Sequence, residues 1–246
     1  MGFDADDRGL PLPLTPGAGR WLAMGVRDDL KRANRRTYQE LVAEVLEVDY
    51  RREPPTLDLG EADRARGREF AARHAPGDGR LLVGLNTGAG GRWRFKRWTE
   101  SGYAALIGRL GREGHRVLLL GGPDAAERNA RLAAGSRGVA VDTGSRNSVR
   151  TFAGIVDACD AVVTGDTLAL HVALARGVPV VVLFGPTSLH EIEVFDRGAR
   201  LAADLDCRVC YLPDCDVRPH CMESIGVDEV HAAILRCARA TPLERA

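Results

Sequence analysis

The sequence predicts an α/β fold built on a Rossmann-like, doubly wound parallel sheet. Two apolar runs, 161–164 and 178–184, have the composition of parallel strands that are buried on both faces, and each stops at a glycine. A helical segment at 167–176 joins them, as in a βαβ crossover. From Arg80 onward, further apolar runs alternate with helical segments, which is the pattern of a sheet covered by helices on both faces.

The expected elements follow in chain order. Strands are expected at 81–86, 116–121, 139–142, 161–164 and 178–184. Helices are expected at 99–113, 125–134, 149–158 and 167–176, with a last amphipathic helix at 228–240. In the first part of the chain we expect irregular structure at 1–20, a helix within 28–48, a linker or edge strand at 51–59, and a charged helix at 61–74.

Composition narrows the class of protein. The 246 residues suffice for one large or two small domains. The 34 Lys and Arg residues balance 34 Asp and Glu residues, so the formal net charge of zero argues against a bulk nucleic-acid binder. The chain lacks the apolar run of about 18 residues that a transmembrane helix needs, and its N-terminus lacks the apolar region of a signal peptide. We therefore expect a cytoplasmic protein whose cysteines are mostly reduced.

Small and polar residues follow two neighbouring strands, Gly-Asp-Thr at 165–167 and Gly-Pro-Thr at 185–187. Open α/β sheets bind ligands at this carboxyl edge, and helix N-termini there favour anions. Asp166 stands where a helix N-cap belongs, and Thr167 and His171 lie one turn apart on one helix face. A hydroxyl, an imidazole and a helix N-terminus could thus meet at one phosphate. The alternatives are that Asp166 only caps the helix and that His171 is a packed core residue.

A glycine-rich loop at 86–91 follows the first strand of the sheet and could bring backbone N–H groups close to phosphate oxygens. It does not fit the dinucleotide fingerprint, because Trp93 stands where the third glycine belongs. The basic and aromatic run at 92–98 comes next and could neutralise a diphosphate; the alternative is a solvated loop. After the second strand, Glu127 could reach a ribose hydroxyl or could be a surface carboxylate.

Four of the six cysteines form the pattern Cys207-x2-Cys210-x4-Cys215-x5-Cys221. Such a set suits a tetrahedral site for a structural zinc ion or, with less support, an iron–sulfur cluster. Four thiolates leave no open coordination position, so the metal would be structural rather than catalytic. The alternatives are reduced thiols packed in a tight loop and adventitious disulfides.

Together these motifs resemble glycosyltransferase family 9, the ADP-heptose:lipopolysaccharide heptosyltransferases. The resemblance runs from about residue 81 to residue 239. It rests on Lys-Arg-Trp at 96–98, Gly-Asp-Thr-Leu-Ala-Leu-His at 165–171, Leu-Phe-Gly-Pro-Thr at 183–187 and Cys-Met-x-x-Ile at 221–225. It implies a GT-B fold, in which the C-terminal domain holds the nucleotide-sugar donor and the N-terminal domain holds the acceptor.

The resemblance also implies roles for individual residues. Donor binding is expected from Thr87, Gly88, Lys96, Glu127, Asp166, Thr167 and His171. Within this set Lys96 is expected at the diphosphate, Thr87 near the phosphates and Glu127 near the ribose. Lys96 and His171 are also expected to stabilise the charge that develops on the leaving group. Leu168 stands where the family often has glycine, which leaves the identity of the donor sugar open.

The expected domains are a partial acceptor lobe with its linker at 1–78 and the donor-binding domain at 79–246, with the cysteine loop at 207–221. The family's N-terminal domain opens with a glycine-rich strand and loop that supplies an acidic catalytic residue, and we find no such element here, so the general base is unassigned. We expect transfer of heptose from ADP-heptose to a lipopolysaccharide-core or other lipid-linked glycan, with no metal needed for catalysis. Contact with the inner face of the inner membrane is also expected.

Other interpretations of the chain's function stay open. The chain could be a fragment with a mis-set start, could pair with a complementing chain, or could be a non-catalytic subunit that binds donor without transferring it. A Rossmann dehydrogenase is disfavoured by the broken glycine fingerprint at 88–93. The cysteine loop alone would also fit a zinc-dependent interaction module.

Overall fold

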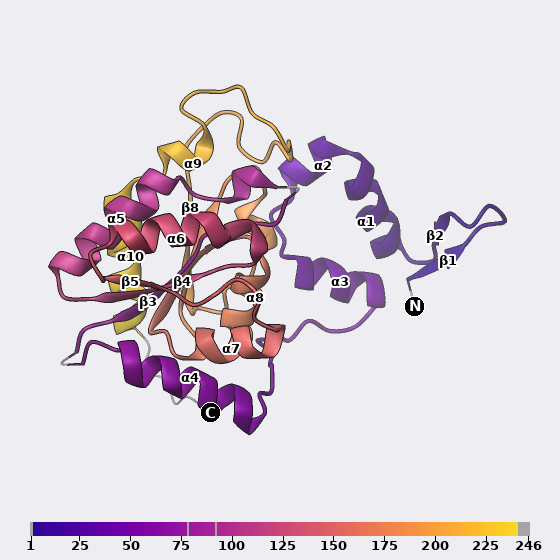
Figure 1. Ribbon diagram of the computed structural model, residues 1–246. Helices are drawn as coiled ribbons and strands as arrows, with labels where there is room; N and C mark the ends of the chain where they lie inside the picture. Colours follow the sequence, from indigo (N-terminus) through magenta and orange to yellow (C-terminus); the bar gives the residue numbers. More distant parts are fainter. Residues whose placement is uncertain (1, 78, 92, 241–246) are drawn as a thin grey trace.

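The computed structural model describes residues 2–77, 79–91 and 93–240. Its centre is a six-stranded sheet in the order β5-β4-β3-β6-β7-β8, with every neighbouring pair parallel (Figure 1). The strands are β3 (Leu82–Asn86), β4 (Arg116–Leu120), β5 (Ala140–Asp142), β6 (Ala161–Gly165), β7 (Val180–Phe184) and β8 (Gly198–Ala202). This is the Rossmann strand order, and the direction of winding reverses between β3 and β6.

Helices cover both faces of the sheet, which confirms the doubly wound architecture (Figure 1). On one face lie α4 (Glu61–His74), α7 (Val149–Asp157) and α8 (Leu168–Ala175). On the other lie α5 (Glu100–Arg112), α6 (Ala126–Gly135) and α10 (Val227–Arg239). Two separate apolar clusters fill the spaces between sheet and helices, because side chains of each strand point alternately to the two faces.

The expected strands and helices of this sheet are all present, with ends shifted by one or two residues. Strand β8 was not predicted. Its sequence, Gly-Ala-Arg-Leu-Ala, has only one residue that is buried, because it lies at the edge of the sheet, so it lacks the apolar run of the inner strands. A four-residue helix, α9 (Cys221–Ser224), follows the cysteine loop.

The first part of the chain contains more regular structure than predicted. Residues expected to be irregular form a short hairpin of β1 (Phe3–Ala5) and β2 (Pro11–Pro13), followed by the start of α1 (Pro16–Val26). The expected helix within 28–48 is two helices, α2 (Asp28–Ala33) and α3 (Tyr38–Leu46). The chain starts a new helix after α2 because Thr37 caps the N-terminus of α3. The Thr37 hydroxyl accepts a hydrogen bond from the Glu40 N–H at 3.3 Å, and the Glu40 carboxylate accepts one from the Thr37 N–H at 2.6 Å.

Helix α4 packs against α7 at a close crossing of two glycines. A Cβ atom on Gly67 would lie 2.1 Å from the Gly154 carbonyl oxygen, and one on Gly154 would lie 2.1 Å from the Asp63 oxygen. Only glycine therefore allows the two backbones to approach this closely. We call residues 61–240 the sheet domain and residues 2–59 the N-terminal segment, which ends in the stretch 51–59, where no helix or strand forms. The expected boundary between residues 78 and 79 stays a prediction.

No helix in the described part of the chain combines the length and the apolar character needed to cross a bilayer.

Candidate functional site at the carboxyl edge of the sheet

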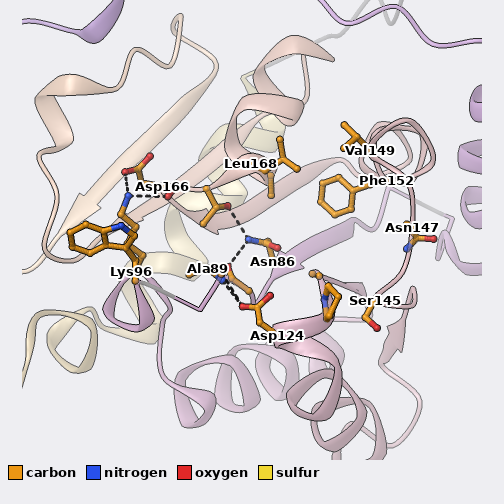
Figure 2. A pocket seen from close by; sticks show the side chains of 18 residues that line it. Asn86, Ala89, Lys96, Asp124, Ser145, Asn147, Val149, Phe152, Asp166 and Leu168 are labelled. Atoms are coloured by element: carbon orange, nitrogen blue, oxygen red, sulfur yellow. Dashed lines mark hydrogen bonds and ion pairs between the residues drawn. The ribbon is translucent and has the colours of Figure 1, made fainter. Parts of the chain in front are cut away.

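A cavity of about 380 Å³ opens where the winding of the sheet reverses, at the carboxyl ends of β3, β4, β5 and β6 (Figure 2). Its size lies within the range of small-molecule sites in proteins. We call it the sheet-edge cavity. Its lining comprises Asn86, Gly88, Ala89, Gly90, Trp93, Lys96, Gly121, Gly122, Pro123, Asp124, Ser145, Asn147, Val149, Phe152, Asp166, Thr167, Leu168 and Ala169.

An ion pair between Lys96 and Asp166 forms one wall of the cavity, and the two side chains point toward each other in Figure 2. The Lys96 Nζ lies 2.6 Å from the Asp166 Oδ2, and the two side chains are only 16% and 18% exposed. The Thr187 hydroxyl donates to the same carboxylate oxygen at 3.2 Å. The motifs after β6 and β7 therefore meet at one carboxylate, as the sequence predicted from their place at neighbouring strand ends.

The predicted N-cap role of Asp166 is wrong. The N-cap of α8 is Thr167, which makes no side-chain capping hydrogen bond. The Asp166 carboxylate is instead turned toward the ammonium group of Lys96, because a partly buried carboxylate gains more from a cation at hydrogen-bond distance than from a neutral N–H group.

Two glycines at strand ends allow Lys96 to reach this position. Lys96 belongs to the short 3₁₀ turn η1 (Arg94–Lys96), which lies directly against the ends of β6 and β7. A Cβ atom on Gly165 would lie 2.1 Å from the Lys96 carbonyl oxygen, and one on Gly185 would lie 2.3 Å from the Phe95 oxygen. Both separations are far shorter than van der Waals contact, so any larger residue would push the turn and its lysine away.

Asn86 organises the floor of the cavity. Its side-chain amide donates to the Gly88 carbonyl at 3.1 Å and to the hydroxyls of Thr164 and Thr167 at 3.0 and 3.1 Å. Its own carbonyl accepts from the buried Tyr103 hydroxyl at 2.9 Å. Because β3 and β6 are neighbours at the point where the winding reverses, this amide ties together the two loops that line the cavity.

The glycine-rich loop after β3 already has an anionic partner. The Asp124 carboxylate accepts from the backbone N–H groups of Ala89 and Gly90 at 3.1 and 3.0 Å. The anion that these N–H groups contact is therefore a side chain, and their predicted approach to phosphate oxygens stays a prediction. Asp124 itself was not among the predicted site residues, although it follows β4 as Asp166 follows β6.

Of the described residues in the basic run, only Lys96 has its charge in the cavity lining. Arg94 pairs with the Asp214 carboxylate, and Arg97 donates to the Arg94 carbonyl at 3.3 Å. Arg92 lies outside the described residues. Trp93 contributes an aromatic wall, with its ring centroid 5.5 Å from the Lys96 Nζ.

Three predicted donor-binding residues lie outside this lining. Thr87 is buried beneath the loop, where its hydroxyl donates to the Asn129 side chain at 2.6 Å. Glu127 and His171 are exposed on α6 and α8. Their roles stay predictions, whereas Gly88, Lys96, Asp166 and Thr167 are brought together at the cavity. The lining also includes Ser145 and Asn147, which sequence reasoning missed. They are polar residues in the loop after β5, the same type of position that identified Asp166.

The four cysteines of the loop 207–221 all line one small cavity beside Phe95 and Pro186. No disulfide joins them in the described chain. Burial raises the pKa of the Cys221 thiol to about 11, and the charges of Cys210, Cys215 and Cys207 add to this effect. Across residues 2–77, 79–91 and 93–240, no three His, Cys, Asp or Glu side chains are already placed as ligands of one metal ion.

Fold and cavity together define a Rossmann-type α/β protein whose site lies where the sheet reverses its winding. The family model "Glycosyltransferase family 9 (heptosyltransferase)" matches residues 28–207, and the chain belongs to this family. This confirms the resemblance stated from the motifs.

Similarity to an individual relative agrees with this family assignment. Over 132 residues the chain is 34% identical to lipopolysaccharide heptosyltransferase 1 of Pseudomonas aeruginosa, an alignment that covers 53% of this chain and 37% of that protein. The chain therefore matches well under half of that relative's length.

Two solved structures share the fold. A glycosyltransferase family 9 protein from Veillonella parvula superposes with a TM-score of 0.72 at 20% identity, over 85% of this chain and 62% of the other. The E. coli ADP-heptose lipopolysaccharide heptosyltransferase II gives a TM-score of 0.62 at 20% identity, over 80% and 57%. The fold class predicted from the sequence, a GT-B-type Rossmann-like domain, is thereby confirmed.

Proposed function

We propose that the sheet-edge cavity binds a nucleoside-diphosphate sugar and that the chain serves the transfer of heptose from ADP-heptose to a glycan of the lipopolysaccharide core. The observation that carries the proposal is the Lys96–Asp166 pair at the point where the sheet reverses. A lysine held by a neighbouring carboxylate is positioned to contact a phosphate oxygen. The E. coli structure, whose name includes ADP-heptose, supports this choice of donor.

In the proposed reaction an acceptor hydroxyl attacks the anomeric carbon of the sugar. A carbon–oxygen bond to the acceptor forms, the bond to the diphosphate breaks, and its electron pair leaves with ADP. Lys96, Thr167 and the N-terminus of α8 face the place where this negative charge develops. The predicted contribution of His171 requires its exposed ring to meet the donor at the rim. The general base stays unassigned in this mechanism, and catalysis without a metal ion stays an expectation.

Titration calorimetry with ADP tests the donor site. Replacing Lys96 by alanine removes one charge-assisted hydrogen bond, so we expect ADP binding to weaken by about 1.5–3 kcal/mol. Lys31→Ala is the matched control, because Lys31 is the only other lysine in the sequence and lies outside the sheet-edge cavity. Unchanged ADP affinity in both Lys96→Ala and His171→Ala would show that the donor site is assigned wrongly.

A second candidate function is a non-catalytic donor-binding subunit that works with a complementing chain. The large apolar side chains exposed on the N-terminal segment favour it, since apolar surface of this kind suits a protein partner. A transfer assay on the purified chain, alone and with a co-expressed neighbouring gene product, distinguishes the two candidates. Transfer by the chain alone would exclude the second.

The cysteine loop supports a further element of this proposal, a structural zinc ion held by Cys207, Cys210, Cys215 and Cys221. The four side chains border one cavity and would need to converge on the ion. Elemental analysis of the purified protein for zinc and iron tests this, with a Cys210→Ser and Cys215→Ser double variant as comparison. The expected cytoplasmic location at the inner face of the inner membrane, and contact with a lipid-linked acceptor, stay predictions.

A further inference from the structure

A second cavity, of about 270 Å³, is bordered by the turn η1 and by the first turns of α5 and α6. Arg97, Trp98 and Thr99 line it between η1 and α5, Arg128 lines it from α6, and His220 lines it just before α9. We call it the arginine pocket. None of its lining residues belongs to the lining of the sheet-edge cavity, so the two cavities are separate sites.

Two half-buried arginines lie at this pocket with most of their donors unused. The Arg97 Nε donates to the Arg94 carbonyl at 3.3 Å, and the Arg128 Nη1 donates to the Thr87 carbonyl at 2.7 Å. Within residues 2–77, 79–91 and 93–240, neither guanidinium forms an ion pair with a carboxylate or any further hydrogen bond. A guanidinium has five N–H donors, so both side chains can still bind an anion.

The nearby carboxylates do not neutralise these two charges. Glu100 lines the pocket, but its two oxygens both accept from Arg131, each at 2.8 Å. Asp124 already accepts from two backbone N–H groups of the glycine-rich loop. The pKa of Arg97 is lowered, first by burial and then by the charge of Arg128, and the opposing effect of Asp124 is smaller. Two like charges held close together with water partly excluded repel each other, and an anion between them would remove this cost.

The N-terminus of α5 adds to the attraction for an anion. Thr99 is its N-cap, and the Thr99 hydroxyl accepts from the Gly102 N–H at 3.0 Å and from the Ser101 hydroxyl at 3.3 Å. The hydroxyl therefore keeps its own proton for a ligand. In a helix of 13 residues the first N–H groups have no acceptor within the helix, and the helix dipole favours negative charge at this end.

The charge and the walls of the pocket indicate the class of ligand. A phosphate monoester carries about −1.5 to −2 charges at pH 7, which matches two guanidinium groups, whereas a carboxylate or a phosphodiester carries only one. Phe95 and Trp98 also line the pocket, and the edge-on rings of Phe95 and His220, with centroids 5.0 Å apart, form one wall. The volume leaves room beside a phosphate group for part of the molecule that bears it.

We propose that the arginine pocket binds the phosphate monoester of a small polar molecule such as a sugar phosphate, and that Arg97 and Arg128 hold the phosphate between them. The inference goes beyond the proposed function, because it assigns an anion site outside the donor cavity and does not depend on what that cavity binds. Arg97 directly follows Lys96, so one short segment would supply a cation to each of the two sites.

Phosphorus-31 NMR titration of the full chain with glucose 6-phosphate tests the inference. We expect binding by the unmodified chain, and a Kd that rises about tenfold in Arg97→Gln and in Arg128→Gln, because each loses a charge-assisted hydrogen bond. Arg112→Gln is the matched control: Arg112 is an exposed arginine of α5 outside the pocket, so the Kd should not change. The methyl phosphodiester of glucose 6-phosphate should bind at least about tenfold more weakly than the monoester.

Lack of binding by the unmodified chain would overturn the inference, and so would a Kd that is unchanged in both Arg97→Gln and Arg128→Gln. Equal binding of the monoester and its methyl diester would contradict the match of charges. Binding that depends on Arg97 with vesicles of phosphatidylcholine and phosphatidic acid, but is absent with glucose 6-phosphate, would show a lipid site instead and overturn the assignment to a small polar molecule.

ADP calorimetry on the same proteins separates this inference from the donor proposal. We expect Lys96→Ala to weaken ADP binding and leave glucose 6-phosphate binding unchanged, and Arg97→Gln to do the reverse. If Lys96→Ala raised the Kd for glucose 6-phosphate and Arg97→Gln did not, the monoester would lie in the sheet-edge cavity and the inference would be wrong. Failure of the unmodified chain to bind ADP, beside glucose 6-phosphate binding that depends on Arg97, would overturn the donor proposal alone.

Discussion

The sheet domain and the N-terminal segment are stabilised in different ways. In the sheet domain, strands β3, β6 and β7 are buried at every position, and helices cover both faces. In the N-terminal segment many large apolar side chains face solvent. Of the twelve exposed ones in the described chain, eight lie between residues 10 and 48, and Val26 reaches 80%. The sheet domain thus carries a complete hydrophobic core, whereas the N-terminal segment shares little of it.

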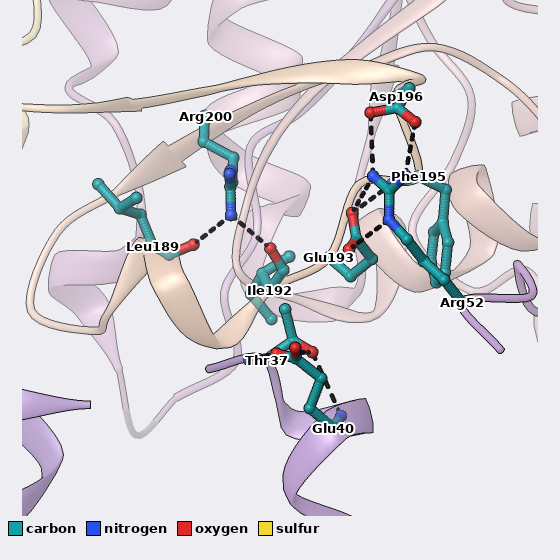
Figure 3. Close-up of polar contacts among 9 residues, drawn as sticks. All are labelled: Thr37, Glu40, Arg52, Leu189, Ile192, Glu193, Phe195, Asp196 and Arg200. Atoms are coloured by element: carbon teal, nitrogen blue, oxygen red, sulfur yellow. Dashed lines mark hydrogen bonds and ion pairs between the residues drawn. The ribbon is translucent and has the colours of Figure 1, made fainter. Parts of the chain in front are cut away.

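The N-terminal segment is attached to the sheet domain by both apolar and polar contacts: Leu59 packs in the core of the sheet domain, and Arg52 forms ion pairs with it. Figure 3 shows the Arg52 guanidinium reaching two carboxylates of the loop before β8. It donates to Glu193 at 3.0 and 3.2 Å and to Asp196 at 2.7 and 2.9 Å. Arg52 is about half exposed, so water screens these bonds and they contribute less than burial does. The comparison teaches that the sheet-edge cavity is built wholly within the part of the molecule that has the larger core.

Hydrogen exchange should reveal the largest difference. Amides of β3, β6 and β7 open only in global unfolding, while those of α1 and α3 can open locally, so we expect protection factors to differ by about a thousandfold or more. Exchange followed by mass spectrometry on the intact chain measures both regions at once. Equal protection in the two regions would show that the N-terminal segment is as firmly packed as the sheet domain.

A matched pair of leucine substitutions sharpens the comparison. Leu85 on β3 is fully buried, so Leu85→Ala should lower the free energy of unfolding by about 2–5 kcal/mol. Leu46 on α3 is 42% exposed, so Leu46→Ala should cost under about 1 kcal/mol. Urea unfolding followed by circular dichroism provides the measurement. A cost for Leu46→Ala as large as that for Leu85→Ala would contradict the view that the sheet domain holds most of the core.

Gly165→Ala tests how tightly the sheet domain fixes its site. The new methyl group would overlap the Lys96 carbonyl oxygen and displace the lysine, so we expect ADP affinity to fall roughly tenfold, equal to about 1.4 kcal/mol. Gly135→Ala is the control, because no atom lies within 4 Å of its added Cβ and its backbone is helical. Normal ADP binding by Gly165→Ala would mean that the turn carrying Lys96 adapts freely.

The smallest expected effects concern pH, and they differ between the two regions. Burial lowers the pKa of His115, whose ring nitrogen accepts from the Leu81 N–H at 2.9 Å. His115 therefore binds a proton more readily in the unfolded chain than in the folded sheet domain. Its contribution to the free energy of unfolding is fully present above about pH 6.5 and declines as the pH falls below that value. A hydrogen bond from Arg52 lowers the pKa of Asp196. The contribution of the ionised Asp196 carboxylate to the free energy of unfolding is therefore present above about pH 4 and is lost below it.

Thermal unfolding as a function of pH measures both effects. His115→Gln should flatten the decline in Tm between about pH 7 and 5.5, because glutamine does not titrate. Arg52→Gln should reduce the further decline below about pH 4. Identical Tm profiles for the two variants and the unmodified chain would exclude both groups as sources of the pH dependence.

The sequence predicted the sheet domain well because its signals are local. Apolar runs located the inner strands, and the residues directly after them located the cavity. Strand β8 was not predicted, because an edge strand with Arg200 at its centre has no apolar run. The hairpin β1–β2 was not predicted, because its second strand is Pro-Leu-Pro, a sequence that argues against a strand.

The site was predicted in part. Lys96 and Asp166 were both identified, but their pairing joins residues 70 positions apart in sequence and depends on how the turn η1 packs on Gly165. Asp124 was missed, since one carboxylate shortly after β4 carries no pattern of its own. Its hydrogen bonds to the Ala89 and Gly90 N–H groups form between residues about 35 positions apart in sequence.

The pairing of Lys96 with Asp166 also has a consequence for how a nucleotide arrives. Because the ammonium brings its own counter-charge, the pair projects little net field into the surrounding solvent. A charged molecule would then be drawn in only over the last few ångströms, where the lysine can exchange one oxyanion for another. Encounter should proceed at an ordinary diffusive pace that added salt barely changes, with discrimination exerted at close range rather than by long-range steering.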